Sequence, residues 1–413
     1  MINSCAMFSW RFLTTIDGRW ATAAILAVFF LALAITSKIT HLEIFDLGPY
    51  ALVGPMPPYF ADLRGVVAGT ERMREGIPPW TADLHDPWNR PYNYPKWPLY
   101  SDLLGLNRDT VVPFGLGMMA LFFAASFYAL GRLSLFGGLA AGIFLTSVSI
   151  QYALVRGNLD VVNYIIIALA LAWRRLPAVA ATVIAIAASL KLYPIFGFLA
   201  LLSPPWKKNL VALALGLGVF GLVELGDLQQ VMIANQHSWN LKSSELSFGT
   251  AILGIHLIDY FHRPDLYFKV LAIGSITYLL IVGVVAPLRP TMDLAKIDPR
   301  QLFAFRLGAG IFIGSFGLGI NHDYRCIILL FCLPLLCQWV SDRTALPWSR
   351  TTLLLILAYV NWNAFSWEVW MWSYILKQLV AWAMTAGLIG LTIATLPEIL
   401  QWPKLLRSRA IPA

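Results

Sequence analysis

Charged residues are scarce in this sequence. Asp, Glu, Lys and Arg make up 13% of its 413 residues, whereas hydrophobic residues make up 58%. A soluble domain carries about a quarter charged residues, so the composition excludes an ordinary soluble protein and indicates a polytopic membrane protein. The formal net charge of +8 therefore does not indicate a nucleic-acid partner, because the basic residues of a membrane protein first report its topology.

Cysteine is also rare, with four residues in the chain. Cys5 lies near the N-terminus, and Cys326, Cys332 and Cys337 lie along one predicted helix. Their spacing matches no zinc or redox motif, which excludes a cysteine framework and leaves helix packing as the expected role. The sequence also contains no DxD-type acidic pair and no recognisable internal repeat.

Long apolar runs, by contrast, fill most of the chain. A spanning helix needs about 20 mostly apolar residues. Twelve candidate spans are present, several of them short: 20–37, 111–130, 134–151, 159–173, 177–190, 193–203, 209–225, 268–287, 302–319, 325–341, 351–363 and 374–396. The sequence thus predicts an all-α polytopic membrane protein, one domain over residues 1–413, with about 12 transmembrane helices. A further apolar piece at 250–260 is expected at the interface or as a re-entrant segment.

The basic residues divide the predicted loops into two sets. If the N-terminus is cytoplasmic, every cytoplasmic segment carries at least one Lys or Arg, which is the positive-inside pattern. Both termini, including the tail 401–413, are then cytoplasmic. The opposite, external face holds a long first loop, 38–110, and a second loop, 226–267. No targeting or retention signal is recognisable, which suits a bacterial plasma (inner) membrane.

Several polar stretches that topology does not explain fall on the external face. Besides the long first loop they are RGNLD at 156–160, Lys191, the loop 226–249, NHDYR at 321–325 and NWNAFSWEVW at 361–370. A charged side chain buried at a membrane surface must be paired with an opposite charge, be hydrated or take part in binding or catalysis. Each stretch alone has an ordinary explanation, as a helix cap, a lysine extending to the headgroups or an aromatic belt. Their convergence on one face predicts a single site.

Four of these residues supply cationic or hydrogen-bond donor groups, namely Arg156, Lys191, His322 and Arg325. Arginine binds phosphate with two parallel hydrogen bonds, and lysine binds it as a point charge. The set therefore suits a phosphate, and the apolar bundle beside it suits a lipid tail. The sequence predicts a membrane pocket for a lipid phosphate.

Asp62 lies in the first external loop, near the start of a short helix expected after the prolines at 57 and 58. Proline is well placed at a helix start, and a carboxylate is favoured in the first turn. One interpretation is that Asp62 only caps this helix. The other is that it serves as a base beside the phosphate.

Further polar and aromatic residues are candidates for a donor or acceptor sugar groove. The loop ends in RPYNYPKWPLY, whose rings form either an interfacial belt or a groove wall for a sugar. Glu245 is also an alternative base, although the 226–249 loop can equally be a solvated connection. The groove candidates are Asn93, Tyr94, Asn158, Asp160, Tyr193, Asn240, Glu245, Asp323 and Tyr324.

The ordered series YFADLRG, NYPKWPLY, RGNLDVVNY, SLKLYPIF, HSWNLKSSELSFGTAI and NHDYRCIILLFCLP resembles a known family. It is similar to the bacterial GT-C glycosyltransferases of glycosyltransferase family 87, polyprenyl-phosphate-sugar-dependent mannosyltransferases and their relatives. The similarity runs from about residue 55 to 340. The order RG(N/Q), then KxYP, is its most specific part. Asn158 stands where glutamine is expected, and Lys96 stands where a second proline is common.

The resemblance implies an inverting glycosyltransferase with a GT-C type bundle. It implies a polyprenyl-phosphate sugar as donor, with mannose the first choice, and a glycolipid or glycan as acceptor. Asp62 would deprotonate the acceptor hydroxyl. The leaving phosphate would be held by Lys191, Arg325, Arg156 and His322. Such a leaving group does not require a divalent metal, so we expect neither a metal nor another cofactor.

Other interpretations stay open. A polysaccharide ligase or polymerase would use a pyrophosphate-linked glycan and need more arginines in the external loop, where Arg64, Arg72, Arg74 and Arg90 are available. A flippase would show a polar path through the bilayer or a repeat, whereas mid-span charges are almost absent, Glu224 lying near the end of its predicted helix. A purely structural scaffold leaves the one-sided polar convergence unexplained.

Overall fold

The computed structural model describes residues 17–43, 57–81, 85–202, 206–224, 246–288, 292–341, 347–362 and 371–396. Helices dominate these ranges. The two short strands described, β1 and β2, pair antiparallel, with Ser247 opposite His322 and Phe248 opposite Asn321. The described part of the chain is therefore all-α apart from this bridge, as the sequence predicts.

The elements follow one another as a succession of helices, with 3-10 helices labelled η. In chain order they are α2 (Arg19–Thr40), α5 (Ala61–Arg74), η1 (Trp97–Leu104), α6 (Val111–Leu130), α7 (Leu135–Leu145), α8 (Val148–Arg156), α9 (Leu159–Ala172), α10 (Pro177–Leu190), η2 (Tyr193–Leu201), α11 (Trp206–Glu224), β1 (Ser247–Phe248), α13 (Ile252–Tyr260), η4 (Pro264–Leu266), α14 (Tyr267–Val285), η5 (Leu294–Lys296), α15 (Pro299–Gly317), β2 (Asn321–His322), η6 (Asp323–Phe331), α16 (Leu333–Ser341), α17 (Pro347–Val360) and α18 (Met371–Thr395). Each of the twelve predicted apolar stretches overlaps one or two of these helices, and the predicted short helix of the first loop is α5.

The described helices are those of a membrane protein. Four are long and apolar enough to cross a membrane, namely α2, α6, α14 and the part of α18 from Trp372 to Thr395, and two bent pairs raise this number to six if each pair is one span. The predicted number of twelve exceeds this. Helices α9 and α10 have 14 residues each, which is about 21 Å at 1.5 Å per residue and less than the roughly 30 Å hydrocarbon core.

Two predicted spans are not single straight helices, which corrects the prediction for 134–151 and 325–341. Helices α7 and α8 meet at 49°, and η6 and α16 meet at 60°. At the first bend the Thr146 hydroxyl donates to the Gly142 carbonyl at 3.0 Å, and such side-chain bonds to the preceding turn often bend helices. At the second, Pro334 stands in the first turn of α16, a position that proline favours.

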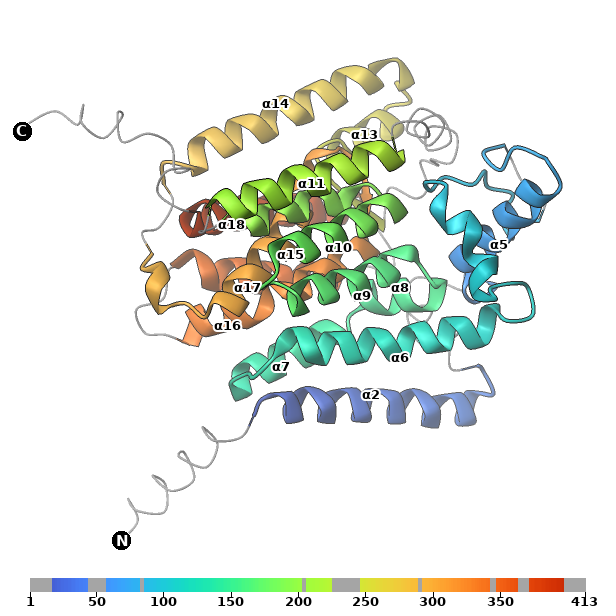
Figure 1. Cartoon of the computed structure of the whole chain (residues 1–413), viewed down its shortest axis with the longest axis horizontal. Coiled ribbons are helices and arrows are strands. Elements are labelled where there is room, and N and C mark those ends of the chain that lie inside the picture. The colour runs from blue at the N-terminus through green and yellow to red at the C-terminus, as the bar shows by residue number, and fades with distance from the viewer. Residues whose placement is uncertain are drawn as a thin grey trace, which may run out of the picture.

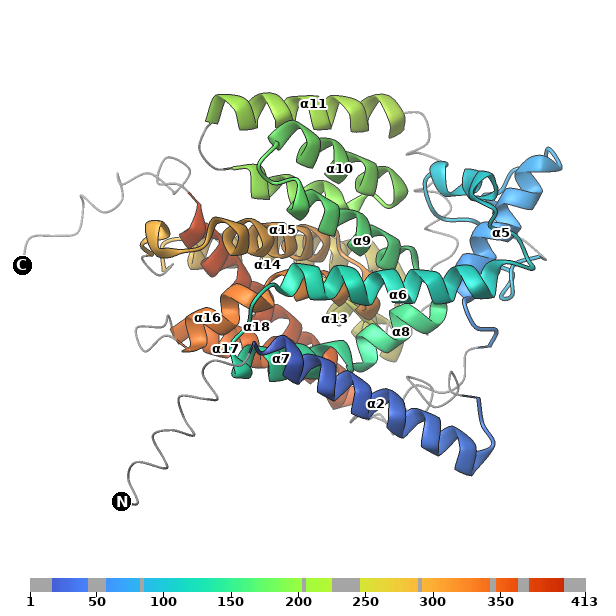
Figure 2. The same cartoon turned by 60° about the horizontal axis from the view of Figure 1, so that its bottom comes forward.

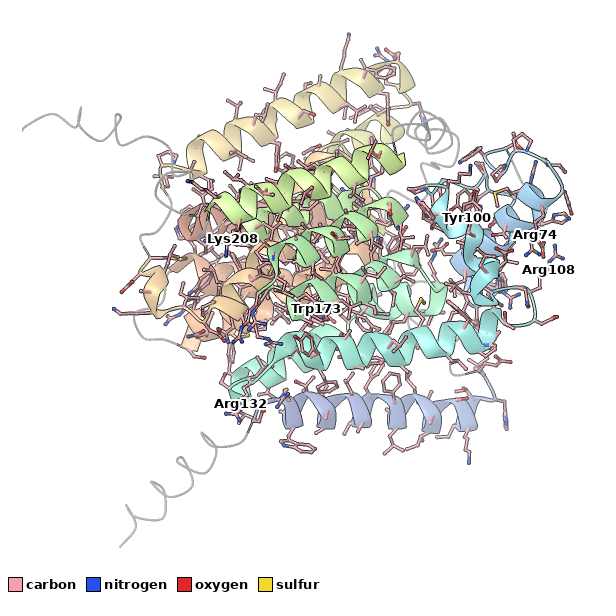
Figure 3. The ribbon with its side chains drawn as sticks, in the orientation of Figure 1. Arg74, Tyr100, Arg108, Arg132, Trp173 and Lys208 are labelled. Carbon is pink, nitrogen blue, oxygen red and sulfur yellow. The ribbon has the colours of Figure 1, made fainter. Side chains whose placement is uncertain are left out.

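The bundle has two distinct ends. Figures 1 and 2 show α5 at one end of the bundle. In Figure 3 the labelled Arg74, Tyr100 and Arg108 lie at this end, while Arg132 and Lys208 lie at the other. The first three belong to the predicted external loop, and the last two belong to predicted cytoplasmic segments. The two sets are thus separated along the bundle, whichever side of the membrane each end faces.

Three of the four cysteines lie in the core, at Cys326, Cys332 and Cys337, and all three are free and buried. The Cys332 thiol points to the Phe305 carbonyl, with 3.7 Å between sulfur and oxygen. These contacts agree with the predicted role in helix packing. Cys5 lies outside the described residues.

Phe60, immediately before α5, fixes this helix to the bundle. Its backbone N–H donates to the Val155 carbonyl of α8 at 2.8 Å, and its φ of 58° is one that residues with a Cβ rarely adopt. Such strain persists where the surroundings over-determine it. Here Gly115 and Gly157 leave the space for the buried ring, because a Cβ on either would lie 2.6 or 3.1 Å from ring atoms.

The opposite face of α5 carries the segment that follows it in the chain. A Cβ on Gly65 would lie 2.9 Å from an Asp86 carboxylate oxygen, and a Cβ on Gly69 would lie 2.9 Å from the Tyr92 ring. The two glycines, four residues apart, share one helix face. Helix α5 is therefore packed between the bundle and its own loop.

Candidate functional site

The RGNLD motif forms the corner between α8 and α9. Arg156 ends α8, and Gly157 follows with φ 61°, the left-handed conformation that glycine supplies after a helix. Asn158 caps α9, because its Oδ1 accepts from the Asp160 N–H at 2.9 Å. Asp160 lies in the first turn of α9, where a carboxylate is favoured. The local sequence thus explains the corner, which presents three polar side chains to one region.

Asp62 receives four hydrogen bonds from side chains. Arg156 donates to both of its oxygens, from Nε to Oδ2 at 2.9 Å and from Nη2 to Oδ1 at 2.6 Å. Arg90 donates from Nη1 to Oδ1 at 2.9 Å, and Asn158 donates from Nδ2 to Oδ2 at 2.5 Å. The N-cap position of α5 is Phe60, and no side-chain cap is formed there. Asp62 therefore does not cap its helix.

The electrostatic balance at Asp62 is set by two opposing effects. Burial disfavours the charged form, since only 1% of the residue is exposed. The attraction and hydrogen bonds of Arg156 and Arg90 outweigh this and hold the pKa of the Asp62 carboxyl well below its usual range. Asp62 is thus an ionised carboxylate whose two oxygens are both engaged.

A second ion cluster surrounds Asp160. Lys191 Nζ lies 2.7 Å from its Oδ1, and the Tyr193 hydroxyl donates to the same oxygen at 2.8 Å. Lys191 also donates to Asn158 Oδ1 at 3.1 Å. Lys191 is therefore paired inside the protein and does not extend to the headgroups. The Asn158 amide joins the Asp62 and Asp160 clusters, since it contacts both.

Arg325 lies at the edge of the Asp160 cluster. Its Nε is 3.8 Å from Asp160 Oδ2, an ion pair too long for a hydrogen bond. One terminal nitrogen donates to Asn321, and the guanidinium stands 4.2 Å from the Tyr193 ring centroid. Among the described residues, Nε and the facing Oδ2 are buried without hydrogen-bond partners. Buried groups of this kind need an explanation such as a ligand.

Aromatic rings line the cationic groups. The guanidinium groups of Arg90 and Arg156 lie 4.4 and 4.6 Å from the Trp88 ring centroid. Lys191 Nζ lies 5.2 Å from the ring of Tyr324 and 5.3 Å from that of Tyr94. Cations over aromatic faces within about 6 Å are attracted to them. Tyr94 and Tyr324, both predicted for a groove, thus belong to the walls of this cluster.

His322 lies beside the cluster as a neutral group. Its Nδ1 is 3.1 Å from the Ser247 hydroxyl, and its ring is 5.1 Å from that of Tyr324. Burial first, and then the nearby cations Arg156, Arg325 and Lys191, lower the pKa of His322 to about 4. His322 can therefore form hydrogen bonds but adds no positive charge near neutral pH.

The lowered pKa of His322 predicts a pH-dependent loss of stability. In the unfolded chain histidine takes up a proton near pH 6.5, while in the fold it does so only near pH 4. Stability is therefore lost as pH falls from about 7, by about 2 kcal/mol at pH 5. We expect thermal unfolding in detergent at pH 7 and 5 to show a smaller drop for His322→Gln than for wild type. His41→Asn, at an exposed helix end, should behave as wild type; equal drops in all three would contradict the assignment.

Asp323 belongs to a buried ion pair within the bundle. Its Oδ1 accepts from the Tyr359 hydroxyl of α17 at 2.6 Å, and its Oδ2 accepts from Lys377 of α18. Both charged side chains are almost fully buried. Sequence reasoning assigned Asp323 to a sugar groove and missed Lys377, whose only signal was a lysine within the predicted span 374–396.

A second charge was also overlooked in a predicted span. Arg306 of α15 is 2% exposed and donates to the Leu202 carbonyl and the Thr395 hydroxyl, both at 3.3 Å. These acceptors end η2 and α18, where a cation is favoured by the helix dipole. Arg306 and Lys377 lie near the starts of the predicted spans 302–319 and 374–396, so the expectation that mid-span charges are almost absent stays a prediction.

The DPWNR segment, residues 86–90, supplies the main site residues that sequence reasoning did not assign. Asp86 accepts from Arg90 Nε at 3.1 Å and from its Nη2 at 2.9 Å, and Trp88 lies under both arginines of Asp62. For Arg90 the sequence predicts only that it is one of several arginines in the first external loop. The sequence feature that could have indicated this pair is the four-residue spacing of Asp86 and Arg90, which allows an ion pair between them.

Three predicted groove positions add little to this geometry. Asn93 is half-buried and lines a small pocket of about 20 Å³ with Asp62, Arg90 and Tyr94. Asn240 and Glu245 lie outside the described residues, as does the aromatic stretch 363–370. Their predicted roles stay predictions.

Within the ranges that the structure describes, no three His, Cys, Asp or Glu side chains lie close enough together to hold a metal ion. No protein-family model matches the chain, and no curated protein or solved structure matches it either. The chemistry of the site is that of its own residues. Two carboxylates, Asp62 and Asp160, are joined through Asn158. Three cationic side chains of the bundle, one arginine of the loop and several aromatic rings surround them.

Proposed function

We propose that the protein is an inverting glycosyltransferase that takes a sugar, mannose as first choice, from a polyprenyl-phosphate donor. The acceptor is a lipid-linked or other glycan. The enzyme has a GT-C type bundle of about 12 transmembrane helices and works at the external face of a bacterial plasma membrane. The observation that carries the proposal is the convergence of one engaged carboxylate, Asp62, with Arg156, Lys191 and Arg325 at one end of an apolar bundle.

The charge balance of the cluster supports a single phosphate. Four cations, Arg90, Arg156, Lys191 and Arg325, face the three carboxylates Asp62, Asp86 and Asp160. One positive charge is left over among the described residues, since His322 is neutral. A sugar linked to a lipid through one phosphate is a phosphodiester with one negative charge, so the donor balances the site. The free Nε of Arg325 offers a donor for one of its oxygens.

The proposed reaction uses the two halves of the cluster differently. Asp62 accepts the proton of the acceptor hydroxyl while that oxygen forms a bond to the anomeric carbon. The bond from this carbon to the phosphate oxygen breaks on the opposite face, and its electron pair leaves with the lipid phosphate. Lys191 and Arg325 stabilise the second negative charge that develops there. One carboxylate suffices, because a single displacement forms no covalent sugar–enzyme intermediate.

The pyrophosphate-linked alternatives fit this cluster less well. A pyrophosphate brings a further negative charge, and three arginines of the first loop are already paired with carboxylates. Arg74 pairs with Asp102, Arg108 pairs with Glu71 at 2.5 Å, and Arg90 pairs with Asp86 and Asp62. These contacts favour a monophosphate donor over the ligase, polymerase or flippase.

Sugar transfer in lipid nanodiscs tests the proposal. The purified protein is given labelled polyprenyl-phosphate mannose with a host lipid extract as acceptor. We expect transfer by wild type and a fall in kcat/KM of about 10²-fold or more for Lys191→Gln, because one charged donor to the leaving group is lost.

Lys296→Gln is the matched control for this assay. Lys296 is exposed and pairs with Asp293 at 3.2 Å near the surface, so its replacement should leave transfer within about twofold. If the protein transfers no sugar from any polyprenyl monophosphate donor but does use a pyrophosphate-linked glycan, the proposed donor class is wrong.

A further inference from the structure

The two arginines that bind Asp62 are held in different ways. Arg90 is fixed independently of Asp62, because its Nε and Nη2 donate to Asp86 and its Nη2 also lies 3.2 Å from the Ala61 carbonyl. Asp86 is itself 5% exposed and accepts from the backbone N–H groups of Trp88 and Arg90. Gly65 allows this pair to pack closely on α5, because a Cβ at Gly65 would lie 2.9 Å from an Asp86 carboxylate oxygen and 3.3 Å from Arg90 Nη2.

Arg156 depends on Asp62 for its ion pair. Its other hydrogen bond is donated to the Tyr152 hydroxyl at 2.5 Å, and no second carboxylate pairs with it in the described ranges. It also lies on the side of the cluster that holds Lys191. The Tyr324 ring centroid lies 5.9 Å from the Arg156 guanidinium and 5.2 Å from Lys191 Nζ, so both cations flank the same ring.

Asp62 cannot serve as a base in this arrangement. Its two oxygens already accept four hydrogen bonds, which leaves no favourable position for an acceptor hydroxyl. The side-on contact from Arg156 is also the geometry in which arginine binds phosphate. A carboxylate therefore occupies the guanidinium edge that a donor phosphate would use.

We propose that donor binding exchanges the partner of Arg156 from Asp62 to the phosphate, while Arg90, fixed by Asp86, stays on Asp62 as its positioning residue. This inference rests on the proposed function and deepens it. The exchange frees one side of the carboxylate for the acceptor hydroxyl only when a donor is in place. The order of binding, donor before acceptor, follows from it.

Binding of polyprenyl monophosphate, which carries no sugar, tests the exchange without requiring turnover. Affinity is measured in nanodiscs for wild type, Asp62→Asn, Arg156→Gln and Arg90→Gln. Because Asp62 competes with the phosphate, its replacement should tighten binding, by about tenfold if the exchanged arrangement has a population of about 10% in wild type. Arg156→Gln should weaken binding about tenfold or more, and Arg90→Gln should weaken it less than Arg156→Gln does, because Arg90 contacts Asp62 and not the phosphate.

The transfer assay adds the readout that distinguishes positioning from a general structural role. Arg90→Gln should lower kcat by a larger factor than it raises the KM for the donor, and Arg90→Lys should recover part of kcat. Where Asp62→Asn does not assemble, Asp62→Ala serves the same binding test. Weaker or unchanged binding in both Asp62 variants would overturn the exchange while leaving the proposed function in place. Failure of wild type to bind polyprenyl monophosphate would contradict the donor class itself.

Discussion

Asp62→Asn is expected to lower the rate of sugar transfer by about 10²- to 10⁴-fold, the usual contribution of a positioned general base. Asparagine has nearly the same shape, and its one oxygen can still accept from Arg90 and from Arg156 Nη2. Its amide group cannot accept from Arg156 Nε and Asn158, and it cannot take the acceptor proton. Initial rates with labelled polyprenyl-phosphate mannose in nanodiscs measure the effect. Together with the tighter donor binding inferred above, the variant should hold its donor well and fail to use it.

Asp102→Asn is the control for this prediction. Asp102 is a carboxylate in the same external segment that pairs with Arg74, and it makes no described contact with the cluster, so its replacement should leave transfer within about threefold. Size-exclusion profiles of both variants show whether they fold. Transfer that survives Asp62→Asn in a folded protein would place the base elsewhere, with Glu245 as the next candidate.

Lys377→Met should give the largest loss of stability, about 3–5 kcal/mol in the free energy of unfolding. The lysine is fully buried against Asp323, and removal of one partner of such a pair leaves an uncompensated buried charge. Methionine keeps most of the side-chain length. Chemical or thermal unfolding in a mild detergent measures the loss.

The double variant Lys377→Met with Asp323→Asn separates charge from packing. It removes both charges, and replacing a whole buried pair is often close to neutral, so most of the lost stability should return. The introduced asparagine would still accept from the Tyr359 hydroxyl that now bonds Asp323 at 2.6 Å. If the double variant is as unstable as Lys377→Met, the lysine contributes through packing and the ion pair is not the cause.

The positions of the helices could be predicted from the sequence, because long apolar runs are a strong and local signal. Their bends could not. The run 134–151 has only the small polar residues Thr146, Ser147 and Ser149 near its bend. Hydropathy alone does not distinguish a continuous helix from α7 and α8 meeting at 49°. Hydropathy alone also does not show that α9 and α10 are short helices, so the number of membrane spans could not be predicted from it.

The site was predictable where charge stands out against an apolar background, as at Arg156, Asp160 and Lys191. Partners were harder to predict, because they come from distant segments. Arg156 lies 94 residues from Asp62, and only the fold of the loop brings Arg90 to the same carboxylate. The contact of Asn158 with both carboxylate clusters could not be predicted either, since an asparagine after a glycine indicates only a helix cap.

The attachment of Phe60 has a mechanical consequence. Asp62 comes two residues after Phe60, and Arg156 comes one residue after Val155. The 2.8 Å hydrogen bond from the Phe60 N–H to the Val155 carbonyl therefore fixes the positions of Asp62 and Arg156 relative to each other. The carboxylate is thus attached to the bundle, while Asp86 and Tyr92 of the following segment pack on the opposite face of α5. A movement of the loop that carries Asp86 and Arg90 would withdraw the Arg90 contact with Asp62, whereas Asp62 and Arg156 would stay attached to the same pair of helices.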